Sequence, residues 1–198
     1  MIPYGRRPGL PRPAEPGPPP AASHRQLHKL FALEGFLARL ASSPHAAQLV
    51  LKGGLLLAAY GECRPTRDVD MQARAVPGER DQVLHLVRDI AATPVDDGLV
   101  FDTDAATAEI IRDDDEYSGV RVTLISTLAS SKLSLHVDVN IGDPISPAPR
   151  VVELPRLLGG TITLAGYPLP MVCAEKIITG GFGECRLLSG LGVRPCCW

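Results

Sequence analysis

The feature that most constrains this chain is a pair of aspartates one residue apart, Asp68 and Asp70, in an otherwise strand-like segment. Alternate residues of a strand point to the same face, so both carboxylates lie side by side if residues 68–74 are extended. Adjacent carboxylates repel each other and lose hydration when buried, and a cation relieves both costs. Ligands that offer only oxygen suit Mg²⁺, which shares itself between protein and substrate phosphates. The sequence therefore predicts a magnesium site at this strand.

Shortly before the acids, the glycine pair Gly53 and Gly54 follows the short apolar run Leu49–Lys52. We expect residues 49–52 to form a buried strand and the glycines to turn the chain into a short helix over 55–60. Glycine lets the backbone approach a bulky anion, and a helix start offers N–H groups and a favourable dipole to phosphates. Gly53 and Gly54 are therefore the predicted nucleotide-binding turn.

Thr66 and Arg67 flank the acid pair. Either side chain can contact a phosphate of a nucleotide bound at the predicted metal. A threonine that begins a strand and an arginine on the surface explain the two residues equally well. Both are kept as candidate nucleotide-binding residues.

A third carboxylate, Asp138, lies in the alternating segment His136–Ile141, which is otherwise filled by valine, asparagine and isoleucine. A lone aspartate on a buried strand is costly unless it is paired, so we expect Asp138 to face Asp68 and Asp70. The alternative is that residues 136–141 form an edge strand with Asp138 on its solvent face. Three carboxylates can hold two divalent ions that bridge a triphosphate, activate an attacking hydroxyl and stabilise the leaving pyrophosphate. This chemistry is nucleotidyl transfer.

Other polar residues have simpler explanations. Lys176 lies beside Glu175 on the last predicted helix, where a lysine usually faces solvent. His85 and His136 have no partner at ligand spacing and are interpreted as structural. The acidic run 113–116 lacks the alternation of a calcium loop and is interpreted as a solvated turn.

Composition bounds the class of protein. The 198 residues are 45% hydrophobic with a net charge of −2, which fits one globular domain with a real core and does not by itself indicate nucleic-acid binding. No stretch is long and apolar enough to span a bilayer, and the N-terminus lacks the apolar region of a secretory signal. The five cysteines have no zinc spacing, so reduced thiols and a cytoplasmic location are expected.

The expected organisation is a Pro-rich disordered arm over 1–22, a domain over 23–180 and an irregular tail over 181–198. Ser23 is the expected N-cap of the first helix, and Gly159-Gly160 the turn of a hairpin. Further helices are predicted over 23–42, 78–92 and from about 170, and strands over 49–52, 68–74, 98–103, 107–112, 119–128 and 133–141. Helices and strands mix without strict alternation, which predicts an α+β fold with a mixed sheet flanked by helices.

Four segments in order resemble the AbiEii/AbiGii toxin family of nucleotidyltransferases, which includes the MenT-type toxins of toxin–antitoxin systems. The resemblance covers about residues 27–178. The matching segments are Lys52-Gly53-Gly54-x-Leu56, Arg64-x-Thr66-x-Asp68-x-Asp70, Asp138-Val-Asn140-x-Gly142-Asp143 and Ala174-Glu175-Lys176-Ile177.

The resemblance implies a DNA-polymerase-β-like nucleotidyltransferase core and assigns roles within it. Lys176 becomes a catalytic residue that holds substrate phosphates, and Thr66 a possible phosphorylation site. The remaining roles agree with the residue chemistry above: Gly53 and Gly54 bind the nucleotide, and Asp68, Asp70 and Asp138 are catalytic metal ligands.

Members of this family transfer nucleotides from an NTP, in some cases pyrimidines to the 3′ end of tRNA, which blocks translation. The implied cofactor is Mg²⁺, and the implied partners are an RNA acceptor, the NTP and a cognate antitoxin. Relatives continue after the last helix with a basic helical region that carries a further Arg and Asp. Here Arg186 and Arg194 follow, with no acid after Glu184. A catalytically impaired remnant or binding module therefore stays as an alternative. A nucleotidyltransferase acting on a small molecule or protein hydroxyl is the other alternative, which the near-neutral net charge permits.

Overall fold

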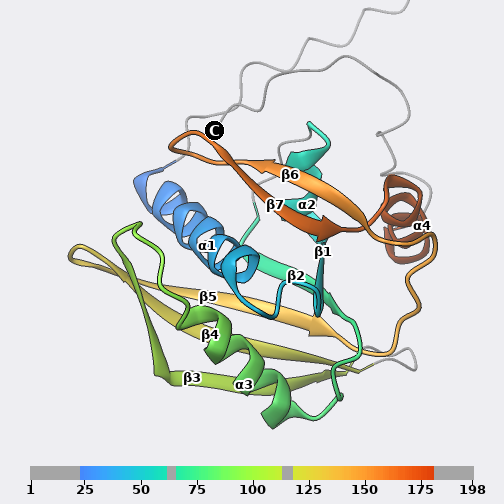
Figure 1. Cartoon of the computed structure of the whole chain (residues 1–198), viewed down its shortest axis with the longest axis horizontal. Coiled ribbons are helices and arrows are strands. Elements are labelled where there is room, and N and C mark those ends of the chain that lie inside the picture. The colour runs from blue at the N-terminus through green and yellow to red at the C-terminus, as the bar shows by residue number, and fades with distance from the viewer. Residues whose placement is uncertain (1–22, 62–65, 113–117, 181–198) are drawn as a thin grey trace, which may run out of the picture.

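The computed structural model describes residues 23–61, 66–112 and 118–180, which form four helices and seven strands (Figure 1). In chain order these are α1 (His24–Ser42), β1 (Leu49–Lys52), α2 (Gly53–Ala59), β2 (Asp68–Ala73), α3 (Arg80–Ala91), β3 (Leu99–Arg112), β4 (Ser118–Leu128), β5 (Ser131–Asn140), β6 (Arg150–Pro155), β7 (Thr161–Gly166) and α4 (Leu169–Gly180).

All seven strands join one sheet in the order β3-β4-β5-β2-β1-β7-β6. The pairs β5–β2 and β1–β7 are parallel, and the other neighbouring pairs are antiparallel. The predicted mixed sheet flanked by helices is therefore confirmed. Strand β5 lies between β4 and β2, so the alternative that placed Asp138 on an edge strand is wrong.

Helices α1 and α3 lie on the same side of the sheet (Figure 1). Helix α1 begins where predicted: the Ser23 hydroxyl accepts the Gln26 N–H at 3.3 Å, and the Gln26 side chain accepts the Ser23 N–H at 2.8 Å. This capping box satisfies two N–H groups that the helix itself cannot. In α3 the four residues predicted to face inward are buried: Val83, Leu86, Val87 and Ile90.

The two faces of the central strands differ in polarity. Val69 and Met71 of β2, with Val137 and Val139 of β5, are fully buried in the core. Each contributes roughly 2 kcal/mol from apolar burial. Because side chains alternate, the intervening acids project from the opposite face of the same strands. The hydrophobic pattern of β2 and β5 thus fixes the face on which a site can lie.

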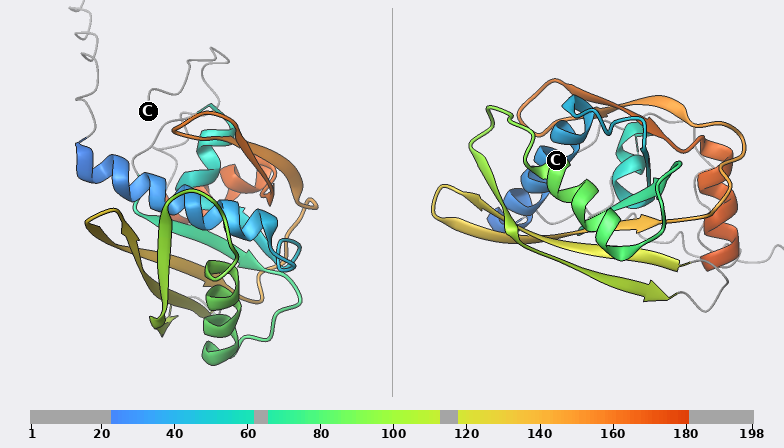
Figure 2. Two further views of the ribbon diagram at one scale, coloured as in Figure 1. Left: turned by 60° about the vertical axis from the view of Figure 1, so that its left-hand side comes forward. Right: turned by 60° about the horizontal axis from the view of Figure 1, so that its bottom comes forward.

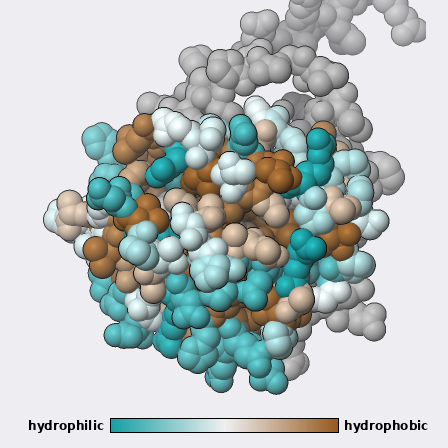
Figure 3. Space-filling view, in the orientation of Figure 1, coloured by the Kyte–Doolittle hydropathy of each residue, from teal (hydrophilic) through white to brown (hydrophobic). Residues whose placement is uncertain are grey.

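The outer surface is uneven in polarity. In the orientation of Figure 1, hydrophilic residues cover the lower part of the molecule around α3, and apolar residues gather in the upper part around α1 and the β6–β7 hairpin (Figure 3). Helix α4 lies at the end of the sheet where β5 and β7 end, as two views agree (Figures 1 and 2). No helix within the described ranges is long and apolar enough to cross a membrane.

Strand β3 departs from expectation. Two strands were predicted over 98–103 and 107–112, but one strand runs from Leu99 to Arg112 with a shift of register between Asp102 and Thr107. Asp102 accepts the Ala105 N–H at 3.0 Å, which supports the irregular segment locally. The predicted break between the two strands is therefore a β-bulge within one strand.

The other local predictions fare as follows. The hairpin at Gly159-Gly160 is confirmed, with positive φ at both glycines. The short helix begins at Gly53 rather than at residue 55, so its bounds are Gly53–Ala59. The Pro-rich arm 1–22, the acidic run 113–116 and the tail 181–198 lie outside the described residues.

Candidate active site

Five adjacent strands each place one charged residue at the same level of the sheet. In sheet order these are Glu109 of β3, Arg121 of β4, Asp138 of β5, Asp70 of β2 and Lys52 of β1, each in register with the next. Residues paired directly across strands lie on the same face and within side-chain reach. We call these five residues the charged row. The row confirms that Asp138 lies beside Asp70, as expected from the sequence.

Asp70 lies at the point of the row where negative charge accumulates. Burial, followed by the neighbouring Asp138 and then by Asp68, raises its pKa to about 6. Lys52 and the hydrogen bond from the Gly54 N–H act in the opposite direction without compensating. The carboxylate is therefore short of positive charge, which is the condition a bound cation relieves.

The glycine pair is explained by close contact with the acid strand. Gly53 has a φ of +66°, and a Cβ at this position would overlap the Asp70 carboxylate. A Cβ on Gly54 would come within 2.8 Å of Thr66 Oγ1. The Gly54 N–H that was expected to bind phosphate donates to Asp70. The glycines thus seat Asp70 against α2, and their role in nucleotide binding stays a prediction.

Asp68 begins β2 on the same face as Asp70 and lies in register with His136 of β5. The Thr66 hydroxyl donates to the Asp68 carbonyl oxygen at 3.3 Å, so Thr66 helps to shape the entry to the strand. Arg67 is exposed. His136, interpreted from the sequence as structural, contacts Thr123 Oγ1 through Nδ1 at 3.1 Å and borders the acid pair.

The carboxylate of Asp138 is held by Arg121. The guanidinium Nε donates to Oδ1 at 2.8 Å and Nη2 donates to Oδ2 at 2.7 Å. Both carboxylate oxygens are therefore engaged on the β4 side of the residue. Among the described residues, no group of three or more His, Cys, Asp or Glu is gathered as a metal site would require.

The chemistry of the donors nevertheless fits a hard divalent ion. Asp68, Asp70 and Asp138 offer only oxygen, and the pKa of Asp70 is raised by burial and by its acidic neighbours. These three carboxylates would hold Mg²⁺ if Asp138 were released from Arg121. Their assignment as metal ligands stays a prediction.

Lys52 connects the row to α4. Its ammonium donates to Glu175 Oε1 at 3.1 Å and lies 5.6 Å from the centre of the Tyr167 ring. Tyr167 is fully buried, and its hydroxyl donates to Gln72, two residues after Asp70. Lys176 follows Glu175 in α4, and its side chain lies outside the described part of the structure. Lys52 thus attaches the helix that carries Lys176 to the strands that carry the acids.

Sequence reasoning missed Arg121 and gave Lys52 no role. Alternation in the segment 119–128 places Arg121 on the polar face of its strand, which is the available signal. Its partner depends on which strand lies next to β4 and in which register. Neither property is encoded locally.

Solved structures identify the class of fold. A protein of Helicobacter pylori described as a nucleotidyltransferase superposes with a TM-score of 0.50 and 19% identity, over 79% of this chain and 59% of that one. JHP933 from Helicobacter pylori gives 0.50 and 16%, over 83% and 61%. The chain therefore spans about six tenths of each. At this identity the likeness shows only that the chain shares the fold of these two proteins.

The family follows from the sequence itself. The model of the nucleotidyl transferase AbiEii toxin family, of type IV toxin–antitoxin systems, matches residues 35–179. The chain belongs to this family, which confirms the resemblance seen in its four motifs. No curated protein sequence is significantly similar to the chain. The matched range contains the glycine turn, all three acids and Lys176.

Proposed function

We propose that this protein is the toxin of a toxin–antitoxin system and acts as a Mg²⁺-dependent nucleotidyltransferase. It transfers a nucleotide, with pyrimidines as the first candidates, from an NTP to an RNA acceptor such as the 3′ end of tRNA. The observation that carries the proposal is the in-register placement of Asp70 and Asp138 on two central parallel strands, in a chain of this family. We further infer that the mixed sheet is a DNA-polymerase-β-like core.

The proposed reaction joins the acceptor hydroxyl oxygen to the α-phosphorus of the NTP. The bond between the α-phosphorus and the oxygen that bridges to the β-phosphate breaks, and pyrophosphate leaves. The proton of the attacking hydroxyl passes to water. Asp68, Asp70 and Asp138 would hold Mg²⁺, which when bound neutralises phosphate charge and lowers the pKa of the attacking hydroxyl. The Gly54 N–H keeps Asp70 oriented. Lys52, in register with Asp70, supplies positive charge beside it, and Lys176 is the proposed phosphate contact.

Two further elements of the proposal come from the family. A cognate antitoxin is the expected partner in the cytoplasm, and Thr66 is the candidate phosphorylation site. Thr66 lies against Gly54 and two residues before Asp68. A phosphate there would add about two negative charges at the edge of an already acidic centre and so oppose NTP binding.

The test is a transfer assay with purified protein, total tRNA, Mg²⁺ and each labelled NTP in turn. We expect label on RNA with the wild-type protein and none with Asp68→Ala. Asp81→Ala is the matched control, because it removes one carboxylate from an exposed position on α3, with 70% of the side chain exposed. Equal labelling by wild type and Asp68→Ala, or no labelling by either, contradicts the proposal.

The same assay separates the alternatives. Both cations of the charged row are engaged in ion pairs, Lys52 with Glu175 and Arg121 with Asp138. Because these cations are already paired, the acceptors tested include protein and small-molecule hydroxyls as well as RNA. Label on a protein or small molecule instead of RNA identifies the second alternative. NTP binding without transfer to any acceptor identifies an impaired remnant or binding module.

A further inference from the structure

We propose that Arg121 and the divalent ion compete for Asp138. Without the ion, Arg121 closes on the carboxylate; when the ion binds, Arg121 turns toward Glu109 and leaves the carboxylate to the metal. The inference rests on the proposed function in one respect, namely that the ion is the one required for nucleotidyl transfer.

The first argument is the geometry of the pair. Two parallel hydrogen bonds of 2.8 and 2.7 Å occupy both oxygens of Asp138. A forked arrangement of this kind uses the lone pairs that a metal would also need. An ion that approaches from Asp70 must therefore displace at least one of the two hydrogen bonds.

The second argument is that Arg121 has somewhere else to go. Glu109 lies directly opposite it on β3, on the same face and exposed. The Arg121 side chain thus lies between two carboxylates, one on each neighbouring strand. About 35% of the Arg121 side chain is exposed, against 14% for Asp138, so the arginine has room to change rotamer.

The third argument is charge. Asp68, Asp70 and Asp138 bring three negative charges to one face, and Lys52 already shares its charge with Glu175. Without an ion, Arg121 supplies the positive charge that Asp138 needs. When a divalent ion binds, Asp138 no longer needs the positive charge of Arg121, whereas Glu109 still attracts the Arg121 side chain.

A positioning role makes the opposite prediction. If Arg121 only orients Asp138 for the metal, its removal must weaken metal binding. If Arg121 competes with the metal, its removal must strengthen binding. The sign of one change in affinity therefore decides between the two roles.

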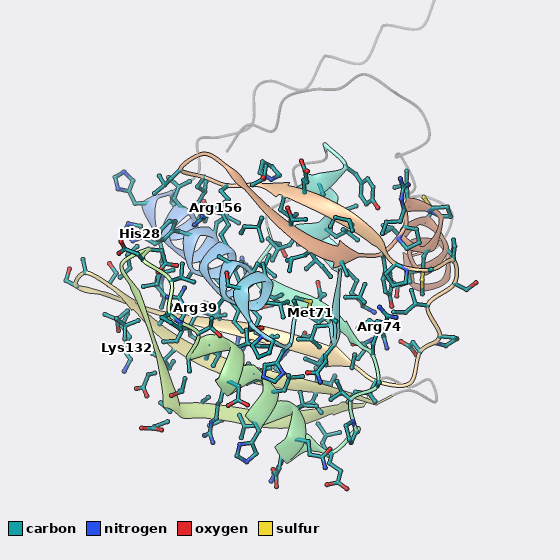
Figure 4. All side chains as sticks on the ribbon, viewed as in Figure 1. His28, Arg39, Met71, Arg74, Lys132 and Arg156 are labelled. Carbon is teal, nitrogen blue, oxygen red and sulfur yellow. The ribbon has the colours of Figure 1, made fainter. Side chains whose placement is uncertain are left out.

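The experiment measures Mn²⁺ affinity without nucleotide, by electron paramagnetic resonance, for the full-length wild type and three variants. We expect Arg121→Gln to bind Mn²⁺ about fivefold more tightly and Glu109→Gln about twofold more weakly, the scale of partly exposed ion pairs. Lys132→Gln removes a positive charge from the same face of β5, about 20 Å along the strand from Asp138, and should change affinity less than twofold. Figure 4 shows Lys132 at the far end of β5.

A second measurement needs no substitution. The Nε–H signal of Arg121 in a ¹⁵N-labelled wild-type protein reports the bond to Asp138. We expect this signal to shift and saturate with added Mg²⁺. An unchanged signal at saturating Mg²⁺, or weaker Mn²⁺ binding by Arg121→Gln, overturns the inference, as does the absence of any Mn²⁺ binding by the wild type.

The outcomes are separable from those of the proposed function. RNA labelling together with unchanged metal affinity in Arg121→Gln leaves the function standing and removes the competition. Tighter metal binding in Arg121→Gln without labelling of any acceptor leaves the competition standing and removes the function.

Discussion

Two arginine–aspartate pairs in this protein share the same forked chemistry and differ in everything around it. Arg39 of α1 donates to Asp97 at 2.6 and 3.0 Å, and also to the carbonyl oxygens of Gly35 and Leu99. Figure 4 shows Arg39 between α1 and the strands beneath it. Only 4% of either side chain is exposed. Arg121, by contrast, donates among the described residues to Asp138 alone.

Burial and the number of partners decide what each pair can do. Arg39 also lies 4.8 Å from the centre of the Phe101 ring, so any movement would break several contacts at once. Such a pair fixes the position of α1 against the start of β3. Arg121 gives up only one partner when it moves and can find another. The first pair is a structural tie, and the second has the properties of an exchangeable one.

The largest expected effect is on transfer activity, and it distinguishes Asp70 from Asp97. Asp70→Asn should reduce nucleotide transfer by about 10³-fold or more, because a ligand of the proposed metal loses its charge. It should not lower the free energy of unfolding, since a buried and repelled charge is removed. Asp97→Asn should do the reverse, with normal transfer per folded molecule and lower stability. Labelled transfer and urea unfolding give both quantities; more than a tenth of wild-type activity in Asp70→Asn would contradict the assignment.

The next effect is on stability. Arg39→Met should lower the free energy of unfolding by about 3–5 kcal/mol, because Asp97 is left buried without its counter-charge. The double variant Arg39→Met with Asp97→Asn should recover part of the loss, since no uncompensated charge remains. Urea denaturation of the single and double variants measures the coupling. Strictly additive losses would show that the two residues do not stabilise each other.

A third effect is the pH dependence of stability, which should have opposite signs for Asp97 and Asp70. Burial alone would raise the pKa of Asp97, but hydrogen bonds from Arg39 and the Leu99 N–H, with the Arg39 charge, lower it below its ordinary value. Its contribution is therefore present above about pH 4 and is lost as pH falls through the folded-state pKa. Burial, Asp138 and Asp68 raise the pKa of Asp70 to about 6, against the opposing effect of Lys52 and the Gly54 N–H. The protein without metal should thus lose stability, by at most about 3 kcal/mol, as pH rises from about 4 to 6.

Urea unfolding in EDTA across pH 3–8 tests both signs. Asp70→Asn should flatten the loss between about pH 4 and 6, and Asp97→Asn should flatten the acid limb. Added Mg²⁺ should stabilise the wild type more at pH 7 than at pH 5, because the ion binds ionised carboxylates. Equal stabilisation by Mg²⁺ at both pH values would remove Asp70 from the metal site.

The smallest expected effect is the loss of stability when Arg121 is replaced. Arg121→Met should lower the free energy of unfolding by about 1 kcal/mol or less, because the pair is partly exposed and screened by solvent. Chemical denaturation beside Arg39→Met compares the two directly. A loss as large as that of Arg39→Met would make Arg121 a structural tie like the other.

Much of the site could be predicted from local pattern. Asp68 and Asp70 sit in one alternating apolar segment, so their shared face follows from the period of a strand. Ser23 was recognised because serine is a preferred N-cap directly before a helical apolar stripe. Both depend on neighbours in the chain.

What could not be predicted depends on distant parts of the chain. Arg121 meets Asp138 only because β4 lies beside β5 in one register, and Lys52 meets Glu175 only after α4 has packed at the end of the sheet. The strand was predicted to be interrupted between residues 103 and 107, but pairing with β4 on both sides keeps it continuous. Long-range pairing overrides local propensity at these places.

The bulge in β3 also selects the residue opposite Arg121. Between its two registered stretches, four residues of β3 lie opposite one residue of β4, since Asp102 pairs with Ile125 and Thr107 with Thr123. If the first register simply continued, Arg121 would face Ala106, which has no charge to offer. The three additional residues bring Glu109 there instead. A β3 shortened by these residues would therefore keep the sheet and the aspartates of the site, but it would leave Arg121 with Asp138 as its partner. The length of an irregular segment far from the metal ligands can thus set how readily the site binds its ion.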